Sequence, residues 1–301
     1  MKAFKPAYLE TYKTGELNRK ILKVEDIMES CTLCPQNCQV NRFHSRKGKC
    51  SSGAFPIVAS FNPHFGEEFP LVGRMGSGTI FFSNCNLKCV YCQNYDISQF
   101  GYGKKISYEA LAEIMMRLQE RGCHNINFVS PTHMIYPILK ALPLAIECGL
   151  KVPLVYNSGG YDSPEILKML SGIFDIYMPD FKYGDNTIAG KFSNAPRYSD
   201  IAKFTIKEMH RQAGDLQVDA RGIAQKGLVV RHLILPGNLA ATYKVIDFIS
   251  GLSINTYLNI MDQYRPEYRA KEFNKLDSPL SHSEYLQYLE YARNKGLERL
   301  D

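Results

Sequence analysis

Six short apolar segments, each followed by a longer amphipathic segment, occupy the chain beyond Gly76. The short segments predict β-strands, and the longer ones predict helices because their apolar residues recur at spacings of three and four. The predicted strands cover residues 79–83, 126–130, 153–157, 176–181, 228–235 and 257–262. The predicted helices cover residues 107–121, 134–148, 163–170, 198–214, 240–250 and 281–295. Strand-then-helix units in series pair their strands in parallel through right-handed crossovers, which indicates a doubly wound sheet or a barrel.

The number of units favours an incomplete barrel. A closed barrel of eight units needs roughly 200 to 250 residues, and the stretch from residue 79 to the end reaches that length with only six units. We therefore predict the fold class α/β, as a partial (β/α)6 TIM-type barrel with an N-terminal cysteine-rich cap. Turn signals of Gly, Asn and Asp in 181–197 and 217–227 predict loops or a short hairpin beside the barrel mouth.

The first 75 residues differ in character from the rest of the chain. A predicted helix over 16–29 leads into four cysteines, and residues 51–78, rich in Gly, Pro and Ser, show no clear helical period. We expect residues 1–75 to form a metal-binding cap and residues 76–301 to form the barrel.

Composition narrows the partners and the compartment. The 36 Lys and Arg residues exceed the 30 Asp and Glu residues by six, without a basic run, so nucleic acid is not expected as a partner. The most apolar segment, 134–156, contains Lys140, Glu147 and Lys151, which excludes a membrane span. Residues 1–6 lack the apolar core of a secretory signal, which predicts a cytoplasmic protein whose nine cysteines are thiols or thiolates.

A cysteine triplet follows the first predicted strand. Cys85, Cys89 and Cys92 are spaced by four and three residues, so a loop can wrap them around one metal cluster. Thiolates are the usual ligands of iron–sulfur clusters, and three of them bind three irons of a 4Fe–4S cube. The fourth iron then stays open for another ligand.

This triplet, placed after the first strand of a six-unit barrel, resembles the radical S-adenosylmethionine (SAM) superfamily. Tyr91, directly before Cys92, fits the same pattern. Segments at both ends of the barrel are similar to the branch of pyruvate formate-lyase activating enzyme-like proteins of uncharacterised role. These segments are 76–82, 92–94, 263–266 and 296–301.

The resemblance implies an oxidoreductase with a 4Fe–4S cluster and SAM as cofactors. In that family the amino and carboxylate groups of SAM chelate the open iron, and an electron from a reductant such as flavodoxin or ferredoxin enters the cluster. The C–S bond then breaks to give methionine and a 5′-deoxyadenosyl radical, which abstracts hydrogen from the substrate. The protein must hold SAM against the cluster and keep solvent away.

Polar residues at the carboxyl ends of the predicted strands are the candidates for holding SAM, together with Tyr91. After the second strand the family commonly has Gly-Gly-Glu-Pro, whereas this chain has Ser130 and Thr132 with no carboxylate, which leaves open which group binds the amino end of SAM. Asn157 and Ser158 resemble the Asn-Gly turn of the activating enzymes, and Asp180 and Lys182 resemble their Asp-x-Lys. The fifth and sixth strands supply two further candidates, Arg231 and Gln263.

Other interpretations exist for some of these residues. Asp180 and Lys182 also fit a structural ion pair. His232 follows Arg231, so strand alternation turns it to the opposite face, toward core or helices. Cys123 and Cys148 fit simple packing residues.

A second cysteine set lies in the cap. Cys31, Cys34, Cys38 and Cys50 offer four sulfurs that could complete either a zinc site or a second 4Fe–4S cluster, and residue types alone do not separate the two. A third interpretation is reduced cysteines without metal.

Three functions compete. The leading one is a radical SAM enzyme that abstracts hydrogen from its substrate, and within it the activation of a glycyl-radical enzyme stays open. The second is radical SAM modification of a small molecule or peptide, and the sequence does not choose between these two. The third is a non-enzymatic iron–sulfur or zinc protein that transfers electrons, and the polar strand ends of a six-unit barrel argue against it.

Overall fold

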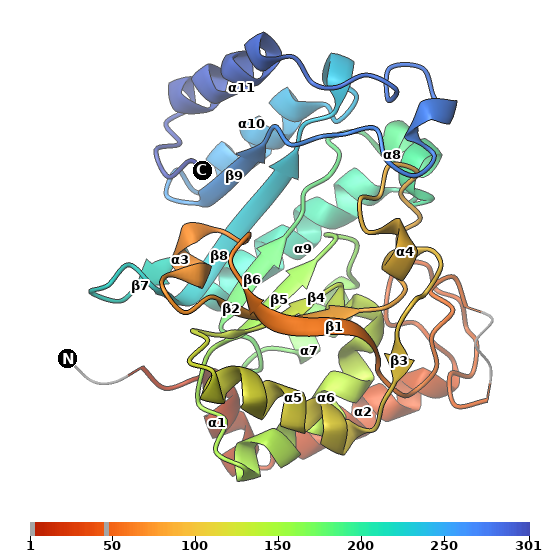
Figure 1. Ribbon diagram of the computed structural model, residues 1–301, viewed down its shortest axis with the longest axis vertical. Coiled ribbons are helices and arrows are strands. Elements are labelled where there is room, and N and C mark those ends of the chain that lie inside the picture. Colours follow the sequence, from red (N-terminus) through yellow and green to blue (C-terminus); the bar gives the residue numbers. More distant parts are fainter. Residues whose placement is uncertain (1–3, 45–47) are drawn as a thin grey trace.

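Six parallel strands form the centre of the molecule. The computed structural model describes residues 4–44 and 48–301. Successive strands of these six pair in parallel, from the first to the last (Figure 1). The predicted six-unit barrel is therefore confirmed. The strands are β2 (Ser77–Phe82), β4 (Ile126–Val129), β5 (Leu154–Ser158), β6 (Ile176–Pro179), β8 (Ala224–Leu233) and β9 (Tyr257–Met261).

Helices follow these strands as predicted. Three of the helices begin at a serine whose hydroxyl accepts a backbone N–H three residues on: Ser107, Ser163 and Ser281. Such caps satisfy N–H groups that have no partner within the helix. The helices are α5 (Tyr108–Glu120), α6 (Ile135–Glu147), α7 (Pro164–Met169), α9 (Tyr198–Ala213), α10 (Thr242–Leu252) and α11 (His282–Asn294).

Strand alternation divides the apolar side chains between two cores. Tyr156 and Tyr177 face the helices, where Tyr177 donates to Gln212 of α9. Their neighbours Val155 and Ile176 face the barrel interior and pack with Leu71, from the short helix α3 (Phe69–Val72). The interior is therefore partly a packed apolar core at this level, where Asn127 of β4 is in register with Val155.

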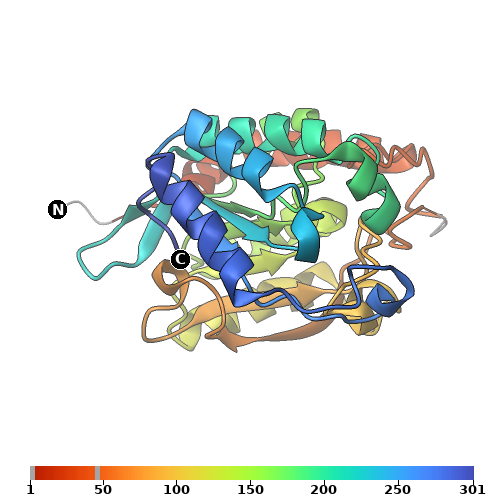
Figure 2. The ribbon, with the colours of Figure 1, turned by 90° about the horizontal axis from the view of Figure 1, so that it is seen from above.

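The barrel is open on one side. Strand β1 (Ile57–His64) pairs antiparallel with β2, and β3 (Lys104–Lys105) pairs with β1. Among the strands in the described parts of the chain, β9 pairs with β8 but not with β1. In Figure 2, β1 (orange) runs along one side of the molecule, while α9 and α10 lie along the other.

Three expectations for the connecting segments need correction. Residues 51–78 show no clear helical period, and the strand β1 that they contain was not predicted. Its Pro63 lies where β1 has no pairing with β3 and needs no N–H donor on that edge. Segment 181–197, expected as loops, contains α8 (Asn186–Ser193), which begins at a cap on Asp185. The hairpin expected in 217–227 is present as β7 (Gln217–Val218) with β8, but it lies at the amino end of β8, opposite the mouth (Figure 1).

The N-terminal part packs beside the barrel. It contains α1 (Ala7–Lys13) and α2 (Glu16–Glu29), and α2 has the bounds that the sequence predicts. Lys20 of α2 donates to the carbonyl of Met169, which ties this helix to α7. The remaining short elements are α4 (Tyr95–Ser98), η1 (Pro131–Met134), η2 (Pro236–Asn238) and η3 (Ala270–Glu272).

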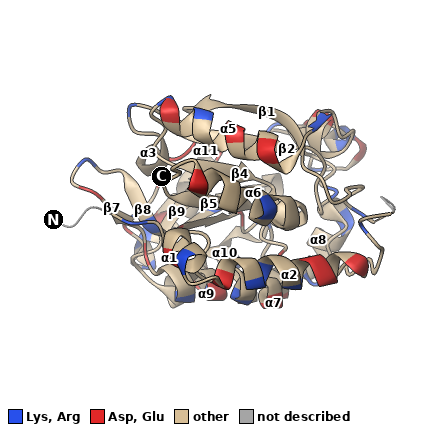
Figure 3. Ribbon diagram, turned by 90° about the horizontal axis from the view of Figure 1, so that it is seen from below, with Lys and Arg blue, Asp and Glu red and all other residues tan. Residues whose placement is uncertain are grey.

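Charge lies on the outer helices. Figure 3 shows Lys and Arg interspersed with Asp and Glu along α2 and α5, with no large area of one sign on these helices. In the described part of the chain, no helix combines the length and apolar character needed to cross a bilayer.

Substitution of Gly160 tests how closely the ends of β5 and β6 approach each other at the mouth. Gly160 has φ +72°, and a Cβ there would overlap the carbonyl oxygen of Asp180. Gly15 has φ +75° with open space around it, so it is a matched control. We expect Gly15→Ala to cost about 1 kcal/mol of unfolding free energy from backbone strain, and Gly160→Ala at least about twice that, because the end of β6 must move.

Urea denaturation followed by circular dichroism measures both losses. Equal losses in the two variants would mean that the contact between Gly160 and Asp180 is not tight.

Candidate metal and cofactor site at the barrel mouth

The cysteine triplet lies in a loop that α8 holds over the carboxyl ends of the strands. Asn84 has φ +69° and turns the chain out of β2. The backbone N–H groups of Lys88 and Val90 donate to the carbonyls of Ser193 and Phe192, at 2.9 and 2.8 Å. The loop is therefore fixed by α8, the element that the sequence did not predict.

Each sulfur of the triplet has its own polar neighbour. The Ser193 hydroxyl donates to Cys89 Sγ at 3.0 Å, and the Leu87 N–H donates to Cys85 Sγ at 3.4 Å. Cys92 Sγ lies 3.1 Å from the Ser98 hydroxyl. Donors aimed at sulfur suit thiolates, because they stabilise the negative charge.

Burial keeps the thiols of Cys85 and Cys89 protonated when no metal is bound. Burial raises the pKa of Cys89 to about 12, although the charge of Lys182 acts in the opposite direction. Burial also raises the pKa of Cys85. Metal binding removes such protons.

A charged network fills the mouth beside the triplet. Asp180 accepts from Lys182 Nζ at 2.6 Å and from Arg231 Nε at 2.8 Å. Arg231 also donates to Asn157 Oδ1 at 2.7 Å and to Glu67 Oε2 at 3.3 Å. The structure thus brings together four of the residues that sequence analysis selected from three strands.

Burial and charge have opposing effects in this network. Burial alone would raise the pKa of Asp180, but Arg231 and Lys182 hold it below its ordinary value. Burial lowers the pKa of Lys182, and Asp180 reverses this and raises it. Asp180 is therefore an anion and Lys182 a cation at neutral pH. The ion pair proposed as an alternative is present, and it lies inside the mouth.

Glu67 was missed by sequence analysis. It lies between β1 and α3, and its carboxylate contacts His64 Nδ1 at 3.3 Å and Arg231. Burial raises the pKa of Glu67, but His64 and Arg231 outweigh it and lower the value. The sequence did contain a signal for Glu67. Residues 51–66 include no Asp, Glu, Lys or Arg, and the acidic pair Glu67-Glu68 follows this uncharged segment directly.

Two predicted cofactor residues point to a different partner. Thr132 Oγ1 and Ser158 Oγ both donate to Asp162, each at 2.6 Å, and Tyr156 adds a third hydroxyl at 2.8 Å. Asp162 is 1% exposed, and burial raises its pKa against the effect of the three donors. Sequence analysis missed this carboxylate, which accepts from Thr132, one of the two residues considered for the amino end of SAM, and from Ser158 of the Asn-Gly-like turn.

The remaining predicted residues lie apart from the charged network. Tyr91 is buried and contacts Tyr183 and Tyr264 edge to face. Ser130 is half-buried with φ +56°. Gln263 is exposed beside Gln93, at a cavity of about 400 Å³.

His232 lies outside the site, as strand alternation predicted. It is fully buried and faces α10, where its Nε2 lies next to the Thr242 hydroxyl. Burial lowers the pKa of His232 to about 4.

Unpaired polar groups lie deep in the barrel. Asn127 is fully buried, and within the described residues neither of its amide atoms has a hydrogen-bond partner. The same holds for Oε2 of Glu68, whose other oxygen accepts from Asn259 at 3.0 Å. Buried polar groups are normally hydrogen-bonded, so a polar molecule or water is expected here.

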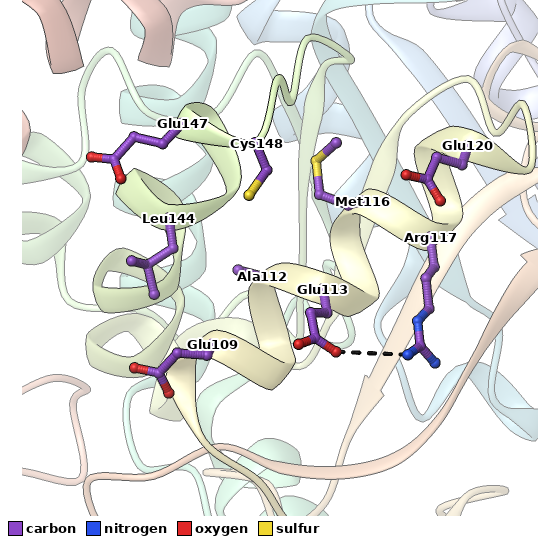
Figure 4. Close-up of a pocket in the computed structure, with 9 residues that line it drawn as sticks. All are labelled: Glu109, Ala112, Glu113, Met116, Arg117, Glu120, Leu144, Glu147 and Cys148. Atoms are coloured by element: carbon purple, nitrogen blue, oxygen red, sulfur yellow. Dashed lines mark ion pairs between the residues drawn. The ribbon is translucent and has the colours of Figure 1, made fainter.

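A large surface cavity lies away from the mouth. Figure 4 shows it between α5 and α6, with a volume of about 600 Å³. Four carboxylates line it, and Arg117 pairs with one of them, Glu113, at 3.6 Å. It lies on the helical outside of the barrel, where no strand end supplies a side chain, so we do not assign it to the site.

The chain is similar to a known family and to one protein along almost its whole length. The family model described as "Radical SAM superfamily" matches residues 79–214. An uncharacterized protein of Methanocaldococcus jannaschii is 35% identical over 300 residues, which cover 96% of this chain and 82% of that protein.

Two further comparisons cover less or agree less closely. The pyruvate formate-lyase-activating enzyme of Clostridium pasteurianum is 29% identical over 132 residues, 41% of this chain and 53% of that enzyme. A solved structure of TYW1 with a lysine-pyruvate adduct bound superposes with a TM-score of 0.44 at 12% identity, over 72% of this chain and 73% of that one.

Asp180 should contribute strongly to stability. Its removal leaves Lys182 and Arg231 largely buried without their shared anion, so we expect Asp180→Ala to lower the free energy of unfolding by about 3–5 kcal/mol. Asp247, which pairs with Lys295 at 2.6 Å on the surface, is the control; Asp247→Ala should cost less than about 1 kcal/mol.

Urea unfolding of the metal-free proteins measures both costs. A loss in Asp180→Ala no larger than in the control would show that the network does not stabilise the mouth.

Proposed function

Because this chain belongs to the radical SAM superfamily, we propose that it is an enzyme that uses a 4Fe–4S cluster on Cys85, Cys89 and Cys92 for hydrogen abstraction. The superfamily implies the cluster, SAM and an external reductant. When bound, they supply one-electron cleavage of the SAM C–S bond to methionine and a 5′-deoxyadenosyl radical. The substrate lies at the barrel mouth in this proposal.

The position of Lys182 is the observation that carries the proposal. Its ammonium bonds Asp180 at 2.6 Å, and its charge acts on the thiols of both Cys85 and Cys89. A loop after the first strand and the end of the fourth strand therefore meet at one place. An ion pair that served only the fold would not need to lie beside three free thiols.

The chain's own residues have distinct tasks in this proposal. Lys182 and Arg231 offer positive charge to the carboxylate of SAM, and Asp180 positions both cations through its two oxygens. Tyr91 packs the triplet loop against Tyr183 and Tyr264, which keeps water from the sulfurs. Asn157 orients Arg231 through its amide oxygen.

The interior polar groups support an enzyme over a protein that only transfers electrons. Asn127 and Glu68 are buried with atoms that lack partners among the described residues. A substrate or ordered water would satisfy them, whereas an electron carrier has no need of unpaired polar groups in its interior. Arg231 and Glu67 lie in the same interior and could contact a polar substrate.

Activation of a glycyl-radical enzyme is a second candidate. It is supported by the 132 residues aligned with the Clostridium pasteurianum activating enzyme. In this proposal a polypeptide loop enters the mouth beside Gln93 and Gln263, where the cavity of about 400 Å³ opens.

The triplet can be tested by product formation. Anaerobic protein, reduced by dithionite or flavodoxin in the presence of SAM, should form 5′-deoxyadenosine, and Cys89→Ala should lose this activity because one iron loses its ligand. Cys123→Ala, a buried cysteine outside the triplet, should retain it. Continued SAM cleavage by the Cys85→Ala, Cys89→Ala, Cys92→Ala triple variant would sink the assignment.

Lys182 can be tested by binding. Lys182→Met keeps the aliphatic stem but removes the charge, so we expect the affinity of the reconstituted protein for SAM to fall about tenfold or more, while its iron content is unchanged. Lys244→Met, an exposed lysine of α10, is the control. Equal SAM affinity in wild type and Lys182→Met would show that Lys182 does not bind SAM and that its role is purely structural.

The activase candidate needs its own experiment. Incubation with candidate glycyl-radical enzymes, reduced flavodoxin and SAM should give a glycyl doublet in electron paramagnetic resonance. Deoxyadenosine without any protein radical would favour a small molecule or peptide as the substrate.

A further inference from the structure

The four cysteines of the cap meet in one place. Cys31, Cys34, Cys38 and Cys50 all line a single small cavity. Figure 1 shows the segment that follows α2 on the same side of the molecule as α4, the helix that follows the triplet. The backbone winds tightly between the first three cysteines, because Cys31 N donates to Val40 O and Gln39 N donates to Cys31 O, each at 3.0 Å. The fold therefore gathers these sulfurs without help from a disulfide.

A buried cation lines the same cavity. Arg42 is 2% exposed, and it donates to three carbonyl oxygens, those of Ser52, Gly53 and His133, at 2.8 to 2.9 Å. Among the residues that the structure describes, no carboxylate pairs with it, and residues 1–3 and 45–47 contain none. A buried charge without a counter-charge costs several kcal/mol, so the cavity is expected to hold an anion.

Four thiolates around a metal supply that anion. Zn²⁺ with four thiolates carries a net charge of −2, and so does an oxidised 4Fe–4S cluster with four thiolates. Four neutral thiols would leave Arg42 uncompensated. The charge of Arg42 thus argues for a metal and against reduced cysteines alone.

His133 provides an independent sign that a group belongs in the cavity. It is 1% exposed and lines the cavity. Its Nε2 lies 2.9 Å from the carbonyl oxygen of Ser83, which can only accept, so Nε2 carries the hydrogen. Nδ1 has no partner in the described parts of the chain. A buried ring nitrogen without a partner is expected to face a bound group.

Zinc and a cluster place different demands on the sulfurs. A zinc ion with Zn–S bonds of about 2.3 Å holds its sulfurs about 3.8 Å apart. In a cubane each sulfur binds a different iron, so the sulfurs lie farther apart. All four sulfurs face one cavity, but the described residues include no group of three metal-binding side chains set around a single ion. We therefore take the cluster as the occupant to be tested and zinc as the alternative that metal analysis would reveal.

Hydrogen bonds join this loop to the triplet loop. Gln36, between Cys34 and Cys38, donates to the carbonyls of Asn86 and Asn194 at 2.9 and 3.0 Å. Asn86 directly follows Cys85. The contact of His133 with Ser83 adds a second link to the start of the triplet loop. A group bound in the cap would therefore also steady the triplet.

We propose that Cys31, Cys34, Cys38 and Cys50 bind a second iron–sulfur cluster, ligated by four thiolates, with Arg42 as its buried counter-charge. This cluster has no open iron, so it does not bind SAM. The proposal does not depend on SAM cleavage, because the second cluster is held by residues outside the triplet.

Metal content of a protein without the triplet is the decisive measurement. The Cys85→Ala, Cys89→Ala, Cys92→Ala variant, reconstituted anaerobically, should retain about four irons and four sulfides per chain. Its dithionite-reduced form should give a cluster signal in electron paramagnetic resonance that SAM does not change. Adding Cys34→Ala and Cys50→Ala should abolish both, whereas adding Cys123→Ala and Cys148→Ala should not.

A complementary variant guards against misfolding of the triplet variant. Replacing only the four cap cysteines by alanine should reduce the iron of the otherwise intact protein by about half, from about eight to about four per chain. One zinc per chain in the triplet variant, or no metal at all in a variant that circular dichroism shows to be folded, would overturn the proposal.

The midpoint potential of the second cluster tests the role of Arg42, because a residue with a purely structural role would not change it. The positive charge of Arg42 favours the more negative, reduced cluster, so Arg42→Gln in the triplet variant should move the midpoint potential to more negative values, and Arg42→Lys should restore most of the shift. Arg19→Gln, on the exposed face of α2, is the control. An unchanged potential in Arg42→Gln would contradict its assignment as counter-charge.

Discussion

The carboxylate of Asp180 is the interaction on which the mouth of the barrel depends. It bonds two largely buried cations, Lys182 and Arg231, from two neighbouring strands. Without this anion Lys182 would be uncompensated in a region of low dielectric and Arg231 would keep only Glu67, which is unfavourable for the folded state. With it, the mouth holds fixed positive charge beside three thiols. The same ion pair thus serves both stability and the proposed binding of SAM.

The open side of the barrel is completed by side chains. No ladder joins β9 to β1 among the described strands, but Glu67 contacts Arg231 of β8, and Glu68 accepts from Asn259 of β9. Both acids come from the segment between β1 and α3. Polar groups rather than backbone pairing therefore span this gap. The amide of Asn127 lacks a partner in the described structure, so a polar molecule or water is expected beside it.

The two cysteine loops form one continuous region. Gln36 of the cap bonds the backbone beside Cys85, and α8 holds the other end of the triplet loop through Ser193. The cap is therefore more than a cover for the barrel, because it helps to position the ligands of the proposed catalytic cluster. A second cluster in the cap would place two redox centres in loops that share hydrogen bonds.

Local patterns in the sequence were enough to determine the six strands, most of the helices and the triplet. These features depend on near neighbours: the spacing of apolar residues, serine caps and the distance between cysteines along the chain. Alternation along β8 was enough to separate Arg231 from His232. Tertiary structure alone decided which groups meet. Asp162 takes the hydroxyls of Thr132 and Ser158, and Glu67 reaches Arg231 across 164 residues of sequence. Long-range contacts of this kind depend on the arrangement of strands in space, about which a local pattern carries no information.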